Sequence, residues 1–370
     1  MISQQTLSTV LQKTAQRMTS IQNQGIKEVC PIGIIDFEKW EWPQGVGLYG
    51  LFQYNRRSGD AASLAYVEDW FARRLAEGLP ARNVNTMAPM LTLAHLAELR
   101  KDAGLLRLCS EWAEWIMREM PRTTDHGLQH IVTGETNEQQ LWDDTLFMTV
   151  LFLAKMGVLT RRQDYIDESV RQFLCHIKYL FDRKTGLWYH GWTFNGRHNF
   201  AEALWARGNC WITAGVMDYI EMIPLDGGVK QYLLDTVTAQ VETLARLQHK
   251  GGMWHTLLDD PSSYLETSAT AGFGYGILKG VRLGLLDAKY LPVGRRALDA
   301  VIANIDEDGT VQQVSYGTGM GRDLDHYRRI PLCPMAYGQA LSVLLLCEGL
   351  HLAPDGGSVS EAPVLAAAGS

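Results

Sequence analysis

The chain has 370 residues, of which 46% are hydrophobic and 20% are charged, and its formal net charge is −7. These totals are typical of a globular protein, long enough for one large core or two smaller ones. The scattered charges and the acidic balance disfavour nucleic acid as a partner, and no stretch is long and apolar enough to predict a membrane span.

The N-terminal segment and the cysteines both favour a cytoplasmic location. Residues 1–18 are too polar for a secretion signal and have the spacing of an amphipathic helix. The six cysteines stand alone, without a CxxC pair or a zinc-ligand spacing: Cys30, Cys109, Cys175, Cys210, Cys333 and Cys347. Reduced thiols in a cytosolic protein are the simplest interpretation.

Helical periodicity recurs along the whole chain, and amphipathic segments alternate with mostly apolar ones. The expected helices are residues 7–22, 42–54, 61–76, 87–99, 105–120, 141–155, 163–181, 205–222, 230–248, 267–285, 290–305 and 334–350. They form six pairs, each with one amphipathic and one apolar member. An apolar helix belongs inside a protein, whereas an amphipathic helix covers it.

The links between these helices differ in length in a regular way. Short turns follow the apolar helices, whereas the return links are mostly long: residues 23–41, 121–140, 183–204, 251–266 and 306–333. This asymmetry places the long loops at one end of an all-α fold, an (α/α)6 barrel. We predict a single barrel domain over residues 1–352 and a loose C-terminal tail over 353–370. Glycines in the apolar helices, such as Gly45 and Gly276, predict close packing inside.

One apolar helix is expected to begin with two acids. From Leu141 onward the stretch LWDDTLFMTVLFLA is apolar around the whole helix, so burial is predicted. Two carboxylates in its first turn are costly to bury without partners. A helix cap explains one of them, Asp143. Asp144 lies one residue deeper and is the first candidate for chemistry.

The long loops and the helix starts that follow them carry aromatic and polar side chains. The candidates are Trp42, Gln44, His130, His190, Trp205, Arg207 and Trp211. Sugar rings stack their C–H faces on aromatic rings, and their hydroxyl groups need directed hydrogen-bond partners. Taken one at a time, a tryptophan here is more often packing, the histidines are more often structural, and Arg207 has the alternative roles of a helix cap or a partner for an acid such as Glu202. Their accumulation at one end favours a binding site.

Other chemistries have little support in the sequence. No serine or cysteine lies in a nucleophile elbow, and no HExxH motif or cluster of carboxylates predicts a metal site. We therefore expect no cofactor and no metal. Acid–base chemistry on a carbohydrate, with Asp144 at its centre, is the remaining hypothesis.

Seven stretches together resemble one enzyme family. They are WEWPQGVGLYG (40–50), NVNTMAPM (83–90), DHGLQH (125–130), QLWDDTLFM (140–148), TGLWYHGW (185–192), LWARGNCW (204–211) and ETSATAGFGYGI (266–277). In this order they are similar to family 105 of the glycoside hydrolases, the unsaturated rhamnogalacturonyl hydrolases. The resemblance spans residues 40–348. One departure is Cys210, which stands where the family usually has glycine and would add a thiol near the loop end, narrowing the pocket.

The resemblance implies an (α/α)6 barrel and an unusual reaction. Such enzymes hydrate the 4,5-double bond of an unsaturated galacturonyl group, after which the linkage to rhamnose falls apart. One carboxylate serves first as acid and then as base, and the family motif assigns this role to Asp144. The resemblance also implies that His190 and Arg207 bind near the uronate. Trp42, His130, Trp205 and Trp211 would line the pocket.

Three alternatives stay open at this stage. An ordinary inverting glycosidase would pair Asp144 with a second acid, Glu266 or Asp143. A sugar epimerase would move a proton with His130 and His190. A sugar-binding protein without activity would not need a buried acid among aromatic rings. The expected partner is a small anionic oligosaccharide, with neither nucleic acid nor a membrane, and the sequence does not determine the oligomeric state or whether the leaving sugar must be rhamnose.

Overall fold

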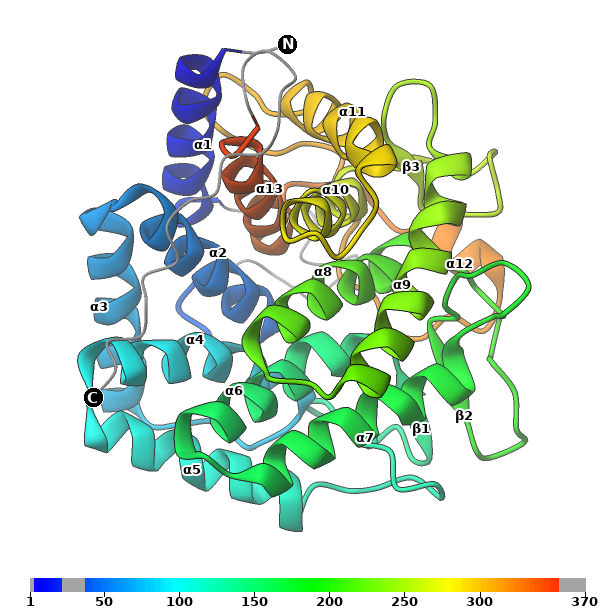
Figure 1. Ribbon diagram of the computed structural model, residues 1–370. Coiled ribbons are helices and arrows are strands. Elements are labelled where there is room, and N and C mark those ends of the chain that lie inside the picture. The colour runs from blue at the N-terminus through cyan, green and yellow to red at the C-terminus, as the bar shows by residue number, and fades with distance from the viewer. Residues whose placement is uncertain (1–2, 22–36, 353–370) are drawn as a thin grey trace.

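The computed structural model describes residues 3–21 and 37–352 and consists of two concentric rings of helices (Figure 1). The inner ring contains α2 (Trp42–Ser58), α4 (Val84–Arg100), η1 with α6 (Leu146–Val150 and Leu151–Thr160), α8 (Ala206–Met222), α10 (Thr267–Arg282) and α13 (Ala336–Gly349). Each inner helix packs against the next one along the chain, and α13 packs against α2. The ring is therefore closed.

The outer ring covers these helices in the order of the chain (Figure 1). It contains α1 (Gln4–Met18), α3 (Ala61–Glu77), α5 (Ala103–Arg118), α7 (Gln163–Leu180), α9 (Gly227–Leu247) and α11 (Leu291–Ile302). In α5, Cys109, Trp112 and Ile116 are buried at spacings of three and four, which is the pattern of a helix with one apolar face. The predicted all-α (α/α)6 barrel is confirmed.

Some expectations differ from the structure or lie outside it. The long loop before α13 contains a short helix, α12 (Leu324–Arg328), and α11 is preceded by a 3₁₀ turn, η2 (Ala288–Tyr290), neither of which was predicted. The expected tail, residues 353–370, and Cys30 lie outside the described residues. The five cysteines within the described residues are free thiols.

Glycines allow the inner helices to approach one another closely. A Cβ on Gly45 of α2 would lie 2.5 Å from the backbone nitrogen of Pro89 in α4. A Cβ on Gly276 of α10 would lie 2.4 Å from the carbonyl oxygen of Thr213 in α8. Only hydrogen fits at these distances, so the loss of helix propensity at glycine is offset by tight packing.

Two short antiparallel ladders connect the long loops. β1 (Gln140–Trp142) pairs with β2 (Gly191–Thr193), and β3 (Trp254–His255) pairs with β4 (Leu265–Glu266). The expected helix start at Leu141 is therefore wrong, because Leu141 and Trp142 pair with β2 and the helix begins at Asp144. It first makes a π-helical turn, η1, a form that often occurs at functional sites.

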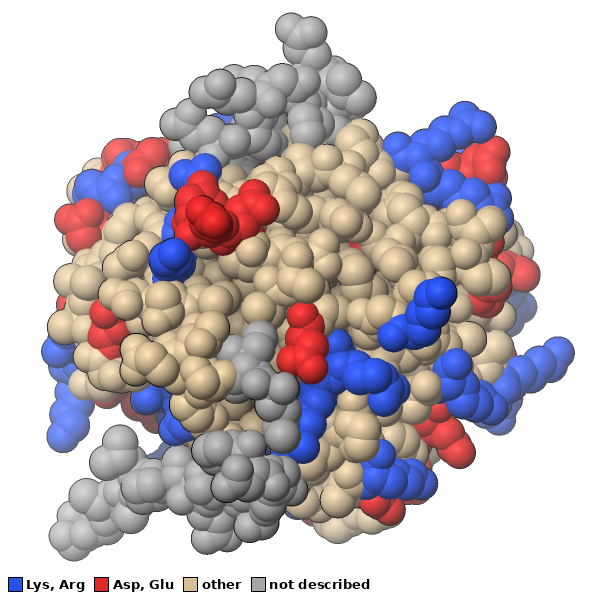
Figure 2. Space-filling view, turned by 90° about the horizontal axis from the view of Figure 1, so that it is seen from above, with Lys and Arg blue, Asp and Glu red and all other residues tan. Residues whose placement is uncertain are grey.

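The distribution of charge on the surface and the lengths of the helices agree with what the sequence predicted about charge and membrane spans. Seen from above, basic and acidic residues are interspersed around an uncharged surface, without a large area of one sign (Figure 2). In the described part of the chain, every helix is too short or too polar to cross a membrane.

Candidate functional site

A cleft of about 470 Å³ opens where several inner helices begin. The residues that line it include Glu41, Trp42, Gln44, Asn85, His130, Glu135, Trp142, Asp144, Trp205, Arg207, Thr318 and Gly319. The volume suits a small ligand. The starts of α2, α4, η1 and α8 contribute to the wall, and helix N-termini carry partial positive charge. The cleft is therefore suited to an anion.

The β1–β2 ladder brings the central residues together from two long loops. Trp142 pairs with Gly191, and the backbone N–H of Asp143 donates to the carbonyl oxygen of His190 at 3.0 Å. On the other side of β1, the backbone N–H of His130 donates to Gln140 at 3.0 Å. His130 and His190 thus flank the turn that carries the two acids.

Asp144 opens into the cleft and contacts His190. Its Oδ2 lies 3.3 Å from Nε2 of His190, and its side chain is 18% exposed. The other ring nitrogen of His190, Nδ1, lies 2.7 Å from the hydroxyl oxygen of Tyr327. His190 is buried, and its ring packs against Trp205 at a centroid distance of 4.4 Å. Neither Oδ2 of Asp144 nor Nε2 of His190 has another hydrogen-bond partner among the described residues.

Asp143 points away from the cleft into the protein. Its side chain is fully buried and lies against Gly208 of α8. Among the described side chains none caps η1, so the interpretation of Asp143 as a helix cap is wrong. The physical reason is that Asp143 ends the strand pairing and its carboxyl group turns toward α8 and Asp144.

The two neighbouring acids differ in their protonation. Burial, and then the charge of Asp144, raise the pKa of Asp143 well above its usual value. Burial acts in the same direction on Asp144, but the neighbouring rings of His190 and His130 and the hydrogen bond with Asp143 outweigh it, and the pKa of Asp144 is lowered. The free site therefore holds a proton on Asp143 and a charge on Asp144.

His130 is a neutral part of the wall. Burial lowers its pKa to about 3. Its Nδ1 lies 2.8 Å from the hydroxyl oxygen of Thr145, and its ring stacks on Trp142 with centroids 4.0 Å apart. The ring is thus fixed in place, with one edge available to the cleft.

Arg207 is held on three sides. Nη1 donates to the carbonyl oxygen of Ser315 at 2.7 Å, and Nη2 donates to that of Tyr316 at 2.8 Å. The guanidinium lies 4.5 Å from the ring centre of Trp205 and 4.9 Å from that of Tyr337. Its Nε has no hydrogen-bond partner among the described residues. Arg207 therefore anchors the loop before α13, and its side chain also lines the cleft.

The aromatic candidates divide into a wall and its support. Trp42 and Trp205 line the cleft, as does Gln44. Trp42 stacks on Tyr337 with centroids 4.6 Å apart. Trp211 is buried behind Trp42, at a centroid distance of 6.3 Å, and is not among the residues that line the described cleft. Trp211 supports the wall instead of forming it.

Cys210 and Glu266 have structural positions. The Cys210 side chain packs against Gly272, where an added Cβ would lie 2.7 Å from the sulfur. It lies between α8 and α10 and does not line the cleft, so the expected narrowing of the pocket is wrong. The Glu266 carboxylate accepts the backbone N–H groups of Ser268 and Ser315 at 3.0 and 2.8 Å. Its role is to cap α10 and hold the neighbouring loop.

The loop between α11 and α13 supplies residues that sequence reasoning did not assign to the site. Thr318 and Gly319 line the cleft, and Tyr327 contacts His190. Their stretch, GTGMG followed by a short helix, has no periodicity that predicts its position. The only signal was that His326 and Tyr327 lie in a long loop at the same end of the barrel.

One group of ligand atoms is compact enough to consider for a cation. Asp143, Asp144 and His190 have ligand atoms within 4.8 Å of one another, among the residues that the structure describes. Two carboxylates and an imidazole at this distance could hold a cation, and the same groups could share a proton.

Comparison with known proteins shows which family has this barrel and this site. The model of Glycosyl Hydrolase Family 88 matches residues 12–353. The chain belongs to this family. It is a glycoside hydrolase, as the sequence predicted. The expected resemblance to the unsaturated rhamnogalacturonyl hydrolases is also confirmed.

Relatives of this family 88 chain include an unsaturated rhamnogalacturonyl hydrolase and two solved structures. The unsaturated rhamnogalacturonyl hydrolase YesR of Bacillus subtilis is 30% identical over 90% of this chain and 95% of its own. A possible member of the GH105 family from Salmonella enterica is 47% identical, with a TM-score of 0.91 over 94% of both chains. A similar protein from Klebsiella pneumoniae is 47% identical, with a TM-score of 0.89 over 94% of both chains.

Proposed function

We propose that this glycoside hydrolase removes the 4,5-unsaturated galacturonyl group from rhamnogalacturonan oligosaccharides by hydrating its double bond. The observation that carries the proposal is the position of Asp144, which opens into an aromatic cleft and contacts His190 at 3.3 Å. The similarity to YesR over 90% of the chain supports the same substrate class.

The mechanism needs one carboxyl group in two roles. Asp144 first gives a proton to carbon 4 and then, as a carboxylate, takes a proton from the water that attacks carbon 5. The resulting hemiketal opens and the leaving sugar departs. The guanidinium of Arg207, which lines the cleft, and the positive ends of the inner helices are the groups suited to the uronate.

The protonation of the free site sets a condition on this mechanism. The contact with His190 lowers the pKa of Asp144, but the first step needs a proton on this group. The negative charge of a bound uronate acts in the opposite direction and raises that pKa. We therefore expect turnover to be highest at mildly acidic to neutral pH and to fall at alkaline pH, measured as kcat against pH.

The positions of the other acids disfavour an ordinary inverting glycosidase. Glu266 is occupied with backbone N–H groups, and Asp143 is buried beside Asp144 and not across the cleft from it. Glu41 lines the cleft, but its Oε1 accepts from Thr133 at 3.1 Å and it caps α2. An epimerase with His130 and His190 is disfavoured because the chain belongs to a glycosidase family.

A pair of substrates tests the proposal. With an unsaturated rhamnogalacturonan disaccharide, we expect loss of the absorbance of the conjugated alkene and release of rhamnose. The matched control is the saturated galacturonosyl-rhamnose, which should not react. Comparable rates on both would refute hydration and favour the ordinary glycosidase. A cytosolic location remains a prediction from the isolated cysteines.

A further inference from the structure

One aromatic side chain reaches the site from outside the inner ring. Tyr327 lies in α12, is fully buried, and contacts Nδ1 of His190 through its hydroxyl oxygen at 2.7 Å. The same oxygen accepts the backbone N–H of Gly321 at 3.1 Å. Tyr327 is not among the described residues that line the cleft, so its contact with the site passes through His190.

The contacts of His190 select one of its two neutral forms. A neutral imidazole carries hydrogen on only one nitrogen, and an ionised carboxylate can only accept a hydrogen bond. The contact with Asp144 therefore needs the hydrogen on Nε2. Nδ1 is then an acceptor, and Tyr327 is its donor. Burial lowers the pKa of His190, which keeps the ring neutral.

The surroundings of the Tyr327 hydroxyl agree with this direction. The N–H of Gly321 can only donate, so it takes a lone pair of the hydroxyl oxygen and leaves the hydroxyl hydrogen free. The competing acceptor is the sulfur of Met320, 3.6 Å from the oxygen. A thioether is a much weaker acceptor than an imidazole nitrogen.

We propose that Tyr327 is a positioning residue, which fixes His190 with its hydrogen on Nε2 so that this hydrogen points at Asp144. The inference rests on the proposed role of Asp144. In this proposal, the loop between α11 and α13 affects the protonation of Asp144 through His190, and Tyr327 itself does not contact the substrate.

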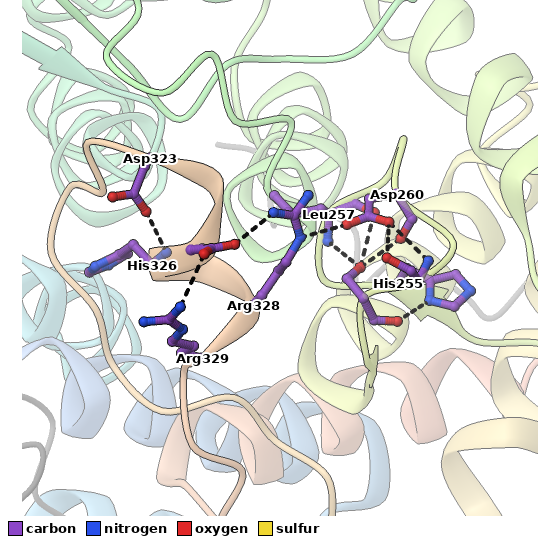
Figure 3. A network of polar contacts seen from close by, with 10 residues as sticks. His255, Leu257, Asp260, Asp323, His326, Arg328 and Arg329 are labelled. Atoms are coloured by element: carbon purple, nitrogen blue, oxygen red, sulfur yellow. Dashed lines mark hydrogen bonds and ion pairs between the residues drawn. The ribbon is translucent and has the colours of Figure 1, made fainter.

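Contacts on two sides hold α12, and therefore Tyr327, in a fixed position (Figure 3). Arg328 of α12 reaches to the loop between β3 and β4, where its Nε donates to Asp260 at 2.8 Å. Asp323 accepts the backbone N–H of His326 at 2.8 Å and thereby caps α12. On the other side, Arg207 holds the carbonyl groups of residues 315 and 316. A short helix that is fixed on both sides holds its tyrosine hydroxyl in a constant place.

Several charged or titratable groups face the His190–Asp144 pair, and any change in pH dependence has to be judged against them. They are Asp143 beside Asp144, His130 before β1, Arg207 on α8, and His326 and Tyr327 on α12. Replacement of Tyr327 by phenylalanine removes only the tyrosine hydroxyl and leaves the other four groups unchanged.

The test compares Tyr327→Phe with Tyr219→Phe. The first variant keeps the ring that packs against His190 and Trp205 and removes the hydroxyl. Tyr219 is a matched control, because it is equally buried and its hydroxyl contacts Ser169 at 2.8 Å between α8 and α7, without a contact to the cleft. Melting temperatures of both variants show whether they fold.

The first measurement needs no substrate. In protein labelled with ¹⁵N-histidine, the ring signals of His190 are assigned by their absence from His190→Gln. We expect hydrogen on Nε2 and an unprotonated Nδ1 in the wild type and in Tyr219→Phe, and a mixture of forms in Tyr327→Phe. Hydrogen on Nδ1 in the wild type would overturn the inference, whatever the substrate is.

The second measurement is the pH dependence of turnover. We expect kcat to fall about tenfold in Tyr327→Phe, the equivalent of one hydrogen bond, with little change in KM. The alkaline limb, where turnover falls as Asp144 loses its proton, should move to higher pH, because Asp144 loses the donor that lowers its pKa. A fall in kcat without a shift of this limb would indicate packing alone and overturn the inference. Wild-type protein with the expected tautomer but without activity on the unsaturated disaccharide would instead refute the proposed function.

Discussion

The carboxyl group of Asp143 occupies the space that a side chain at Gly208 would need. A Cβ on Gly208 would lie 2.2 Å from Oδ2 of Asp143. This fit turns Asp143 into the protein, whereas its neighbour Asp144 faces the cleft. Two adjacent acids are thereby given different environments, and we expect them to contribute differently to the reaction.

We expect Asp144→Asn to fold normally and to lose nearly all turnover, because a sole acid and base contributes toward the upper end of about 10²–10⁴-fold. Asp143→Asn should keep much of its turnover, since an amide replaces a protonated carboxyl group of similar shape. Measurement of kcat on the unsaturated disaccharide, with circular dichroism for the fold, compares the two. If Asp143→Asn is the more damaging change, the catalytic assignment is wrong by one residue.

Asp143→Asn should also change the dependence of stability on pH. Burial raises the pKa of native Asp143, so the folded state keeps a proton that an unfolded aspartate, with a pKa of about 3.9, has released. The folded state then binds more protons than the unfolded state, and stability falls as the pH rises, by about 1.4 kcal/mol per unit up to the native pKa.

Denaturant unfolding at pH 5, 6 and 7 measures this effect. The variant lacks the titrating group, so its free energy of unfolding should exceed that of the wild type by an amount that grows with pH. Asp144 has a lowered pKa, and the stability that it contributes is lost only as the pH falls toward that value, which leaves this range unaffected. A constant difference across the three pH values would contradict a protonated Asp143.

Gly208→Ala tests the fit between the two residues directly. The new Cβ would force the Asp143 carboxyl group out of its place, so we expect lower stability and a large loss of turnover. The matched control is Gly215→Ala in the same helix, whose Cβ would lie 3.3 Å from the Phe147 ring. That change should be close to neutral, because alanine favours a helix by up to about 1 kcal/mol. Equal effects of both substitutions would show that helix propensity alone is responsible.

The barrel could be predicted because its signal is repeated. Six pairs of segments, one amphipathic and one apolar, and long loops at one end leave few architectures to consider. An error of a few residues at the end of one predicted helix does not change the predicted fold when the pattern occurs six times. The closed ring from α2 to α13 follows from this repetition.

The start of the central helix could not be predicted in the same way. Leu141 and Trp142 fit the apolar periodicity of the helix that follows, but they form a strand because β2 is available as a partner. That partner is some 50 residues away in the sequence, and no local pattern indicates it. The same ladder decides that Asp143 turns inward, which is why the cap interpretation was wrong.

The site divides similarly into predictable and unpredictable parts. Residues at the starts of inner helices, such as Trp42, Asp144 and Arg207, could be placed at one end from the fold alone. Tyr327 could be placed at that end but not in contact with His190, and Thr318 could not be placed in the cleft, because the path of their long loop is set by contacts with Arg207 and Asp260. Trp211 was expected to line the pocket, but it packs behind Trp42. Helix periodicity does not show whether a ring faces the cleft or supports its wall.

The resemblance implied that Arg207 binds near the uronate, and the structure shows that its guanidinium also holds a loop. Three of its five N–H donors go to the loop before α13, which leaves one donor on Nη2 and one on Nε. We expect Arg207→Ala to raise KM strongly and also to lower the melting temperature, because the loop loses its anchor. Arg207→Lys should keep only part of the affinity, since an ammonium group cannot contact the loop and the ligand in the geometry of a planar guanidinium.

Two measurements separate the parts that Arg207 plays. Ser315→Ala removes a side-chain contact of the Arg207 guanidinium but leaves the carbonyl acceptor, so it should lower the melting temperature slightly and leave KM almost unchanged. In Arg207→Lys, by contrast, KM for the unsaturated disaccharide should rise at least several-fold, as expected for the loss of a charge-assisted hydrogen bond. Unchanged KM values in both Arg207 variants, together with lower melting temperatures, would show that the arginine only anchors the loop, and that the carboxylate of the substrate is bound by the helix N-termini and other donors of the cleft.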